Sequence, residues 1–187
     1  MQESSKKLYV DAQTLLVDSI KLARMVWNDK FCPTVLVSVW RGGTLPGIAT
    51  DEFFRCRGQR LHHAVIKAQS YDGMEQGESG VQVEGIEDIA AIVKNDDRLL
   101  IIDDVFDTGH TMVAIMNKIS EITKIGDAEC RSATVYYKPA NNKTAIEPSY
   151  YVLAEDRWIV FPHEIIGLTD EELQSRRPEL YAAGLSD

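Results

Sequence analysis

The hydrophobic positions of this chain follow two periods that alternate along it. Residues 11–27 place apolar side chains at helical spacing, and residues 34–40 follow as a short β-branched strand. Helical spacing returns at 47–54, 86–93 and 112–122, and strands are expected at 63–68, 99–102, 133–137, 150–153 and 158–161. Strands that alternate with helices in this way predict an α/β domain with a mostly parallel sheet.

The most informative strand is Leu99–Ile102, which is apolar on both faces, as a central strand of a covered parallel sheet must be. Asp103 and Asp104 follow it, so we expect their carboxylates at the carboxyl end of the strand, where open α/β sheets bind ligands. The turn Asp107–Thr111, Asp-Thr-Gly-His-Thr, then leads into a helix that begins near Thr111. Free backbone N–H groups, threonine hydroxyls and a glycine make this turn a phosphate cradle.

Each acid of this run also has a simpler interpretation, as a helix cap or a solvated strand end. Carboxylates crowded beside a phosphate cradle would repel the phosphate, however, so the run as a whole indicates that they bind sugar hydroxyls, a metal ion or a proton. It therefore predicts a site for a phosphorylated sugar held with magnesium.

Two other classes of protein also place acids after an apolar strand, but they fit less well. The chain has no Gly-x-x-x-x-Gly-Lys-Ser/Thr cradle of an NTPase. A receiver domain would carry its acid pair near the N-terminus, whereas this pair lies in mid-chain.

Composition narrows the classes of function. The chain has 187 residues, of which 44% are hydrophobic and 26% charged, as in an ordinary globular domain. The net charge of −9 argues against nucleic acid or an anionic membrane as a partner. Three cysteines without a Cys-x-x-Cys pair favour reduced, structural thiols. With no signal peptide and no apolar run near the ~20 residues that cross a bilayer, we expect a cytoplasmic protein.

The run Ile101–Thr111 resembles the phosphoribosyl pyrophosphate (PRPP) signature of the type I phosphoribosyltransferases, in which two acids, two apolar residues and Asp-Thr-Gly follow a strand. The resemblance implies the fold of that family: a central, mostly parallel sheet flanked by helices, with a small hood subdomain. It implies a single phosphoribosyltransferase domain over residues 1–187, with the core at about 10–138 and a base-binding hood mainly in 139–187.

Two further segments are similar to parts of this family. Arg41-Gly42-Gly43 would be an ordinary glycine-rich turn on its own, but it resembles the pyrophosphate loop, which often carries a non-proline cis peptide. The Arg41 guanidinium suits phosphate oxygens. Ser70-Tyr71 resembles the closing loop of the purine-salvage members, and the polar tract that continues to Gly85 is expected to be mobile. Composition alone would also fit a surface loop without a role.

A third segment concerns the base. Lys138-Pro139, followed after about 16 residues by a segment with Trp158-Ile159, resembles the 6-oxopurine phosphoribosyltransferases, especially the bacterial xanthine-guanine type. In that group the lysine reaches the 6-oxo oxygen, an aromatic ring stacks on the base, and the backbone near the Trp-Ile pair reads the 2-substituent. A lone lysine is more often a surface residue and a lone tryptophan a core residue. His163-Glu164 departs from that type, which has an aromatic residue there, and leaves the choice among hypoxanthine, guanine and xanthine open.

The resemblance thus implies a purine-salvage transferase that moves the 5-phosphoribosyl group from PRPP to N9 of a 6-oxopurine and releases pyrophosphate. Asp107 is the expected catalytic base, and the base is expected to contact Lys138, Trp158 and Ile159. Mg²⁺ is expected at Asp103 and Asp104, through ribose hydroxyls or water. The residues expected to bind PRPP are Arg41, Gly42, Gly43, Ser70, Tyr71, Asp103, Asp104, Asp107, Thr108, Gly109, His110 and Thr111.

Three expectations remain open at this point. The family implies a homodimer or homotetramer, with the Arg41 loop near the subunit boundary. His110 stands where the family more often has lysine or glycine, and it would make PRPP affinity depend on pH if its ring pointed inward. The alternative functions are a phosphoribosyltransferase-fold regulator that senses PRPP, and a transferase for adenine, orotate or uracil.

Overall fold

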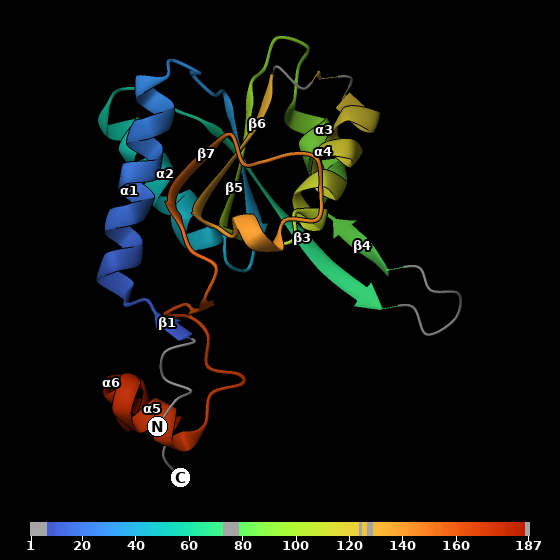
Figure 1. The fold of residues 1–187 in the computed structure, drawn as a ribbon. Coiled ribbons are helices and arrows are strands. Elements are labelled where there is room, and N and C mark those ends of the chain that lie inside the picture. The colour runs from blue at the N-terminus through green and yellow to red at the C-terminus, as the bar shows by residue number, and fades with distance from the viewer. Residues whose placement is uncertain (1–6, 73–78, 124, 127–128, 186–187) are drawn as a thin grey trace. The chain divides into compact units, whose positions relative to one another are not determined.

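The computed structural model describes residues 7–72, 79–123, 125–126 and 129–185. The chain forms two compact units. The larger contains Leu16–Asp156, and the smaller combines Met1–Leu15 with Arg157–Asp187 (Figure 1). Each unit is described in turn.

The larger unit is built on a six-stranded sheet in the order β4-β3-β2-β5-β6-β7. All neighbouring pairs are parallel except β3 with β4. The predicted α/β fold with a mostly parallel sheet is therefore confirmed. The strands are β2 (Val35–Trp40), β3 (His62–Asp72), β4 (Ser79–Glu84), β5 (Leu99–Phe106), β6 (Cys130–Tyr137) and β7 (Tyr150–Ala154).

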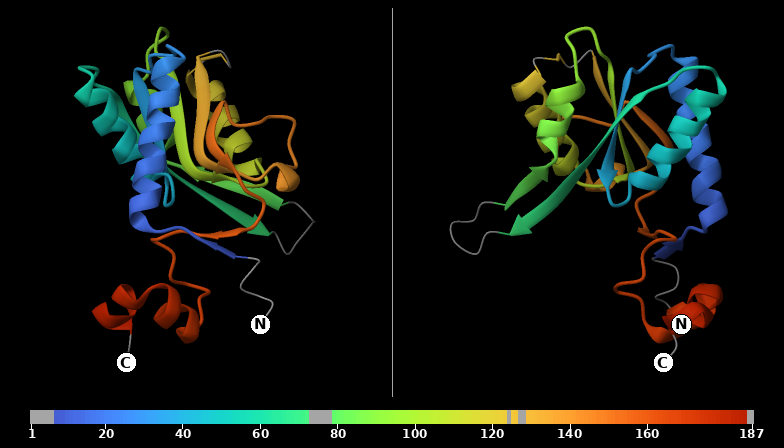
Figure 2. Two further views of the ribbon diagram at one scale, coloured as in Figure 1. Left: turned by 60° about the vertical axis from the view of Figure 1, so that its left-hand side comes forward. Right: turned by 180° about the vertical axis from the view of Figure 1, so that it is seen from behind.

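Helices cover both faces of this sheet, as Figures 1 and 2 show. One face carries α2 (Thr44–Cys56) and the part of α1 (Ala12–Asn28) that belongs to this unit, and the other carries α3 (Ile86–Ile92) and α4 (His110–Thr123). The central strand β5 begins with four completely buried residues because it is covered from both sides. Helix α4 buries three apolar side chains at helical spacing against the core, namely Met112, Ile115 and Ile119.

Two elements differ from the sequence prediction. Strand β5 continues to Phe106, so Asp103 and Asp104 belong to the strand and do not follow it. The extension exists because β6 offers backbone partners along it, with Asp103 opposite Thr134. The polar tract expected to be a mobile loop contains β4, which pairs antiparallel with the second half of β3. Residues 73–78 of that tract lie outside the described residues.

The order of the strands creates a switch point between β2 and β5. The chain leaves β2 through α2 and enters β3 on one side, whereas it leaves β5 through α4 and enters β6 on the other. In open α/β sheets the crevice at such a point, outside the carboxyl ends of the strands, is where ligands bind. Here the segments that follow those two ends are Arg41–Gly43 and Asp107–Gly109.

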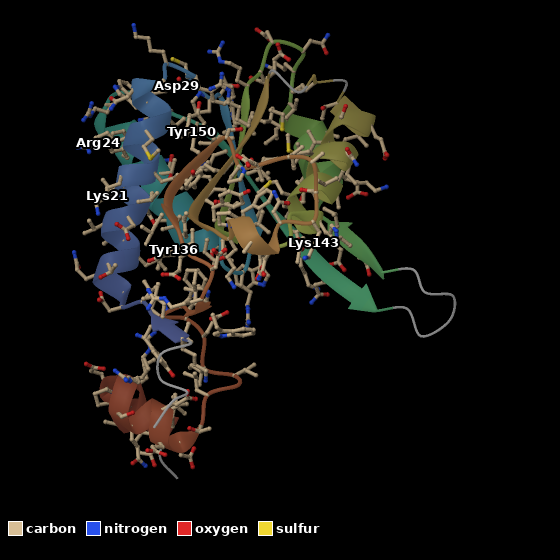
Figure 3. The ribbon with its side chains drawn as sticks, in the orientation of Figure 1. Lys21, Arg24, Asp29, Tyr136, Lys143 and Tyr150 are labelled. Atoms are coloured by element: carbon tan, nitrogen blue, oxygen red, sulfur yellow. The ribbon has the colours of Figure 1, made fainter. Side chains whose placement is uncertain are left out.

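The end of α1 is fixed to the far strands of the sheet (Figure 3). The Tyr150 hydroxyl on β7 donates to Asp29 Oδ2 at 2.7 Å, and the Arg131 guanidinium on β6 donates to both residues. Burial, together with the hydrogen bond to Asp29, raises the pKa of Tyr150 to about 12. Because the phenol stays neutral at physiological pH, this three-residue contact persists there.

The smaller unit pairs β1 (Lys7–Tyr9) in parallel with β8 (Trp158–Val160). The tail of the chain forms α5 (Asp170–Arg176), which starts with a Thr169–Glu172 capping box. After α5 come α6 (Pro178–Leu180) and the helical turn η2 (Tyr181–Leu185). Across the described residues, no helix has the length and apolar character needed to cross a bilayer.

Candidate active site

The acids of β5 and the Arg41 loop lie against each other. Gly42 approaches Asp104 so closely that a Cβ added to it would lie 2.1 Å from Asp104 Oδ2. Gly43 is similarly constrained, since its Cβ would lie 2.2 Å from the Ile102 carbonyl oxygen. The two glycines are therefore required by close approach, and the loop contains the expected non-proline cis peptide, between Trp40 and Arg41. Arg41, whose side chain is exposed, is therefore attached to the backbone next to the residue that contacts Asp104.

Asp103 and Asp104 have different surroundings from ordinary surface acids. Burial, and then the neighbouring charge of Asp104, raise the pKa of Asp103 well above its usual range. The Asp104 backbone N–H donates to Asp103 Oδ1 at 2.9 Å, which partly offsets the rise. Two adjacent acids of this kind attract a cation or hydroxyl donors, because either would relieve their repulsion.

The turn after β5 combines a glycine at positive φ with the start of a helix, and it is the segment predicted to be the phosphate cradle. Gly109 adopts φ +84°, and a Cβ there would lie 2.5 Å from Thr144 Oγ1, so only glycine fits. Helix α4 begins at the next residue, His110, and the first N–H groups of a helix have no partner within it. A cavity of about 200 Å³ opens at this point; its lining is Asp103, Val105, Phe106, Asp107, Thr108, Gly109, Thr111 and Met112.

Asp107 is held by donors from the segment after β6. The Lys138 ammonium lies 3.1 Å from Asp107 Oδ2, and the Asn141 amide donates to Asp107 Oδ1 at 3.0 Å. The Lys138 side chain is only 8% exposed, whereas that of Asp107 is 43% exposed. The Lys138 backbone N–H also donates to the Phe106 carbonyl at 2.9 Å. The structure thus places Asp107, the expected catalytic base, in direct contact with Lys138, the lysine expected to contact the purine.

The other predicted residues are placed as follows. Trp158 and Ile159 belong to β8 of the smaller unit, where Trp158 is 66% exposed and Ile159 is buried. Ser70 and Tyr71 are part of β3 by their backbone, and their side chains lie outside what the structure describes. His110 is exposed and is not among the residues that line the cavity, and it is the first residue of α4.

Sequence reasoning missed Asn141 and the segment that follows it. Lys143 donates its backbone N–H to the Thr108 carbonyl at 2.9 Å, and Thr144 packs against Gly109. The only signal in the sequence is a polar Asn-Asn-Lys-Thr stretch two residues after Lys138-Pro139. Such stretches are typical of any loop, because asparagine and threonine favour turns for local reasons.

The two carboxylates of the site bear on whether it could hold Mg²⁺. Across the described parts of the chain, no three His, Cys, Asp or Glu side chains gather as a ready-made metal site. Asp103 and Asp104 supply two carboxylates, and Gly42 has no side chain to cover them. Mg²⁺ is usually bound by one or two carboxylates together with waters and substrate phosphates. The site therefore fits a magnesium ion that arrives with a phosphorylated substrate.

A family model described as the phosphoribosyl transferase domain matches residues 7–165. This chain belongs to that family. The predicted membership is thus confirmed, and with it the type I phosphoribosyltransferase fold. No curated protein matches the chain.

Several solved structures, among them phosphoribosyltransferases, have the same fold. The purine phosphoribosyltransferase of Pyrococcus horikoshii is 26% identical, with a TM-score of 0.66 over 88% of this chain and 99% of that one. The xanthine-guanine-hypoxanthine phosphoribosyltransferase of Helicobacter pylori is 22% identical, with a TM-score of 0.64 over 83% and 92%. A hypothetical protein from Neisseria gonorrhoeae with bound ppGpp is 16% identical, with a TM-score of 0.71 over 94% and 97%.

Proposed function

We propose that this phosphoribosyltransferase acts in purine salvage and transfers the 5-phosphoribosyl group from PRPP to N9 of hypoxanthine, guanine or xanthine. The observation that carries the proposal is the contact between Lys138 and Asp107, at 3.1 Å, beside the phosphate cradle. This pair offers a strong hydrogen-bond donor and a proton acceptor at one place. A 6-oxopurine presents the complementary pair, with a carbonyl oxygen next to N7.

The nature of Lys138 favours an oxopurine over an aminopurine. A lysine ammonium can only donate hydrogen bonds, so it would face the exocyclic amine of adenine donor to donor. The ammonium is almost completely buried, which makes such an unpaired arrangement costly. Among the relatives, the Pyrococcus protein is described as acting on purines and the Helicobacter protein on xanthine, guanine and hypoxanthine. Trp158 and Ile159 are assigned to the base on the family resemblance.

The reaction forms a bond between purine N9 and C1′ of the ribose and breaks the bond from C1′ to pyrophosphate. We assign the Asp107–Thr111 turn to the 5′-phosphate and Arg41 to the pyrophosphate. Asp103 and Asp104 would hold the ribose hydroxyls and magnesium-bound water. Mg²⁺, when bound, neutralises charge on the leaving pyrophosphate. Asp107 would take the N7 proton as N9 attacks, while Lys138 stabilises charge on the 6-oxo oxygen.

One assay tests this proposal against its alternatives. Purified protein, Mg²⁺ and PRPP are incubated with each base in turn, and nucleotide and pyrophosphate are measured together. We expect equal amounts of both products with at least one 6-oxopurine, and none with adenine, orotate or uracil. Product with one of those three bases would overturn the assignment of Lys138. PRPP binding without product from any base would favour the regulator.

We also propose a homodimer, formed around an apolar patch next to the Arg41 loop. The patch consists of Trp40, Ile48 and Val65, whose exposed fractions are 51%, 67% and 53%. Val65 lies opposite Ser38 in the register of β3 with β2, so the side chains at 38, 40 and 65 point to the same face of the sheet. Gly47 packs on Ser38, so α2 covers that face of the sheet, and the exposed Ile48 is the next residue of this helix. Exposed apolar residues gathered in this way are typical of an interface.

A further inference from the structure

Both carboxylate oxygens of Asp107 are engaged, by two donors of different character. Oδ2 accepts from the Lys138 ammonium and Oδ1 from the Asn141 side-chain amide. The ammonium is charged and almost completely buried, whereas Asn141 is neutral and exposed. These differences matter because, in the proposed reaction, only one of the two donors has another task.

The backbone holds Asn141 in place. It ends the helical turn η1 (Pro139–Asn141), and its own N–H donates to the Lys138 carbonyl at 3.1 Å. The N–H of Ala140 donates to Asp156 Oδ1 at 3.0 Å, which fixes the turn from its other side. Asn141 is therefore presented to Asp107 by a short, doubly attached turn.

The loop after Asn141 is also braced, and it is attached to the phosphate cradle. The Asn142 amide donates to the Ile146 carbonyl at 2.8 Å and to the Tyr137 hydroxyl at 3.2 Å. Its side-chain oxygen accepts the Thr144 N–H at 2.9 Å. Lys143, labelled in Figure 3, donates its backbone N–H to the Thr108 carbonyl. The backbone segments that carry Asn141 and Asp107 are thus joined by hydrogen bonds on both sides of the side-chain contact, from Lys138 to Phe106 and from Lys143 to Thr108.

The two donors have different fates when a base binds. Lys138 has to turn toward the 6-oxo oxygen, and Oδ2 has to accept the proton of N7, so the bond between them is exchanged for bonds to the base. The Asn141 bond to Oδ1 can persist throughout. An amide N–H is not acidic, so it orients the carboxylate without donating a proton to it. A lysine or histidine at position 141, by contrast, could donate a proton to the Asp107 carboxylate that it orients.

We infer that Asn141 is a positioning residue, which donates to Asp107 Oδ1 and thereby keeps Oδ2 directed at the purine N7. The inference rests on the proposed function, because it assigns a role within that reaction. It predicts that the donated hydrogen bond matters for turnover more than the size of the side chain does.

The test compares Asn141→Ala with the isosteric Asn141→Asp. We expect kcat to fall about tenfold in Asn141→Ala, the lower end of what a hydrogen bond to a charged group contributes. In Asn141→Asp we expect a larger fall, since a carboxylate cannot donate and repels Asp107. Asn141→Gln, which keeps a donor, should recover part of the activity. The KM for PRPP and the thermal midpoint should stay near those of the wild type in all three.

A purely structural role predicts the opposite order, with the isosteric Asn141→Asp closest to the wild type. That order, or full activity of Asn141→Ala, would overturn the inference while leaving the proposed function intact. The exposed Glu147 of the same loop provides the control, because Glu147→Ala changes the loop surface without touching Asp107. Absence of nucleotide from the wild type with every base would reject the proposed function, and with it this role.

Discussion

Asp107 differs from the two other acids of the site in what surrounds it. Asp103 and Asp104 lie in β5 beside Gly42, where they repel each other and suit a cation or hydroxyl groups. Asp107 lies beyond the strand, half-exposed, and accepts from Lys138 and Asn141. A general base needs an accessible oxygen within hydrogen-bond reach of the proton that it removes. By this criterion Asp107 is the acid to test for chemistry.

Asp107→Asn tests the assignment because it keeps the size of the side chain and removes its basicity. We predict that kcat falls by about 100- to 10,000-fold, the usual contribution of one general base, while the dissociation constant for PRPP changes little. Steady-state kinetics and calorimetric titration of PRPP measure the two quantities. The exposed Asp96, which lies in a different loop, supplies the control Asp96→Asn. Near-normal turnover of Asp107→Asn would show that the base is another group.

Some residues of the site could be predicted from the sequence, and others could not. The run from Leu99 to Thr111 was informative because a buried strand, three acids and an anion-binding turn seldom occur together. Asn141 was not predictable, since its role depends on a contact across 34 positions of the chain. Gly42 was identified as a small residue, but only the structure shows that Asp104 is what requires it.

At the scale of elements, a strong periodicity of apolar residues was sufficient to predict a helix or strand, whereas a weak one was not. The predictions for α1 and α4 are confirmed because their apolar residues recur at helical spacing and pack on the sheet. β4 contains the short alternation Val81-Gln82-Val83-Glu84, in which the valines are half-buried and the polar residues exposed. Four such residues within a polar tract are a weak signal, and backbone pairing with β3 completes the strand. β1 has only three residues, and it is a strand because β8 pairs with it.

The smaller unit is held together by contacts between its two ends. Glu172 of α5 accepts from the Tyr9 hydroxyl at 2.7 Å and pairs with the Lys7 ammonium. Arg177 is buried, and its guanidinium donates to the carbonyls of Val10 and Val160. The tail of the chain is therefore attached to both strands of the β1–β8 pair, including the strand that carries Trp158.

These contacts predict that the attachment of α5 weakens in acid. Hydrogen bonds from Lys7, Tyr9 and the Thr169 backbone lower the pKa of Glu172 from 4.5 to about 2. A carboxyl whose pKa is lowered by folding contributes stability above its unfolded pKa and loses it as the pH falls toward the folded one. Hydrogen exchange of the α5 amides should therefore show protection at pH 5 that declines between about pH 4.5 and 2.

Two variants make this prediction specific. Glu172→Gln cannot ionise, so its α5 amides should be less protected at pH 5 and nearly independent of pH over the same interval. Glu171→Gln changes the neighbouring exposed carboxyl and should behave like the wild type. Equal protection of the wild-type amides at pH 5 and pH 3 would contradict the role given to Glu172.

At the scale of the whole molecule, strand order brings together motifs that are distant in the sequence. Arg41 and Lys138 directly follow β2 and β6, and Asp104 lies near the carboxyl end of β5, which stands between those two strands in the sheet. Because these strands are parallel, their carboxyl ends lie at one edge of the sheet. Between β2 and β5 the direction in which successive strands are added to the sheet reverses, which makes this edge a switch point. The alternation of helices and strands predicted a mostly parallel sheet, whereas the order of its strands and the distances between these residues required the structure.

The same strand order leaves the patch of Trp40, Ile48 and Val65 exposed beside the Arg41 loop, and the proposed homodimer gives it a partner. Ile48→Glu should convert the dimer to a monomer, because association would bury a carboxylate among apolar side chains. Sedimentation velocity at micromolar concentration measures this change. Ile122→Glu, at an exposed position on α4 across the sheet, should leave the dimer intact. A monomeric wild type, or a dimeric Ile48→Glu, would show that the patch is not the interface.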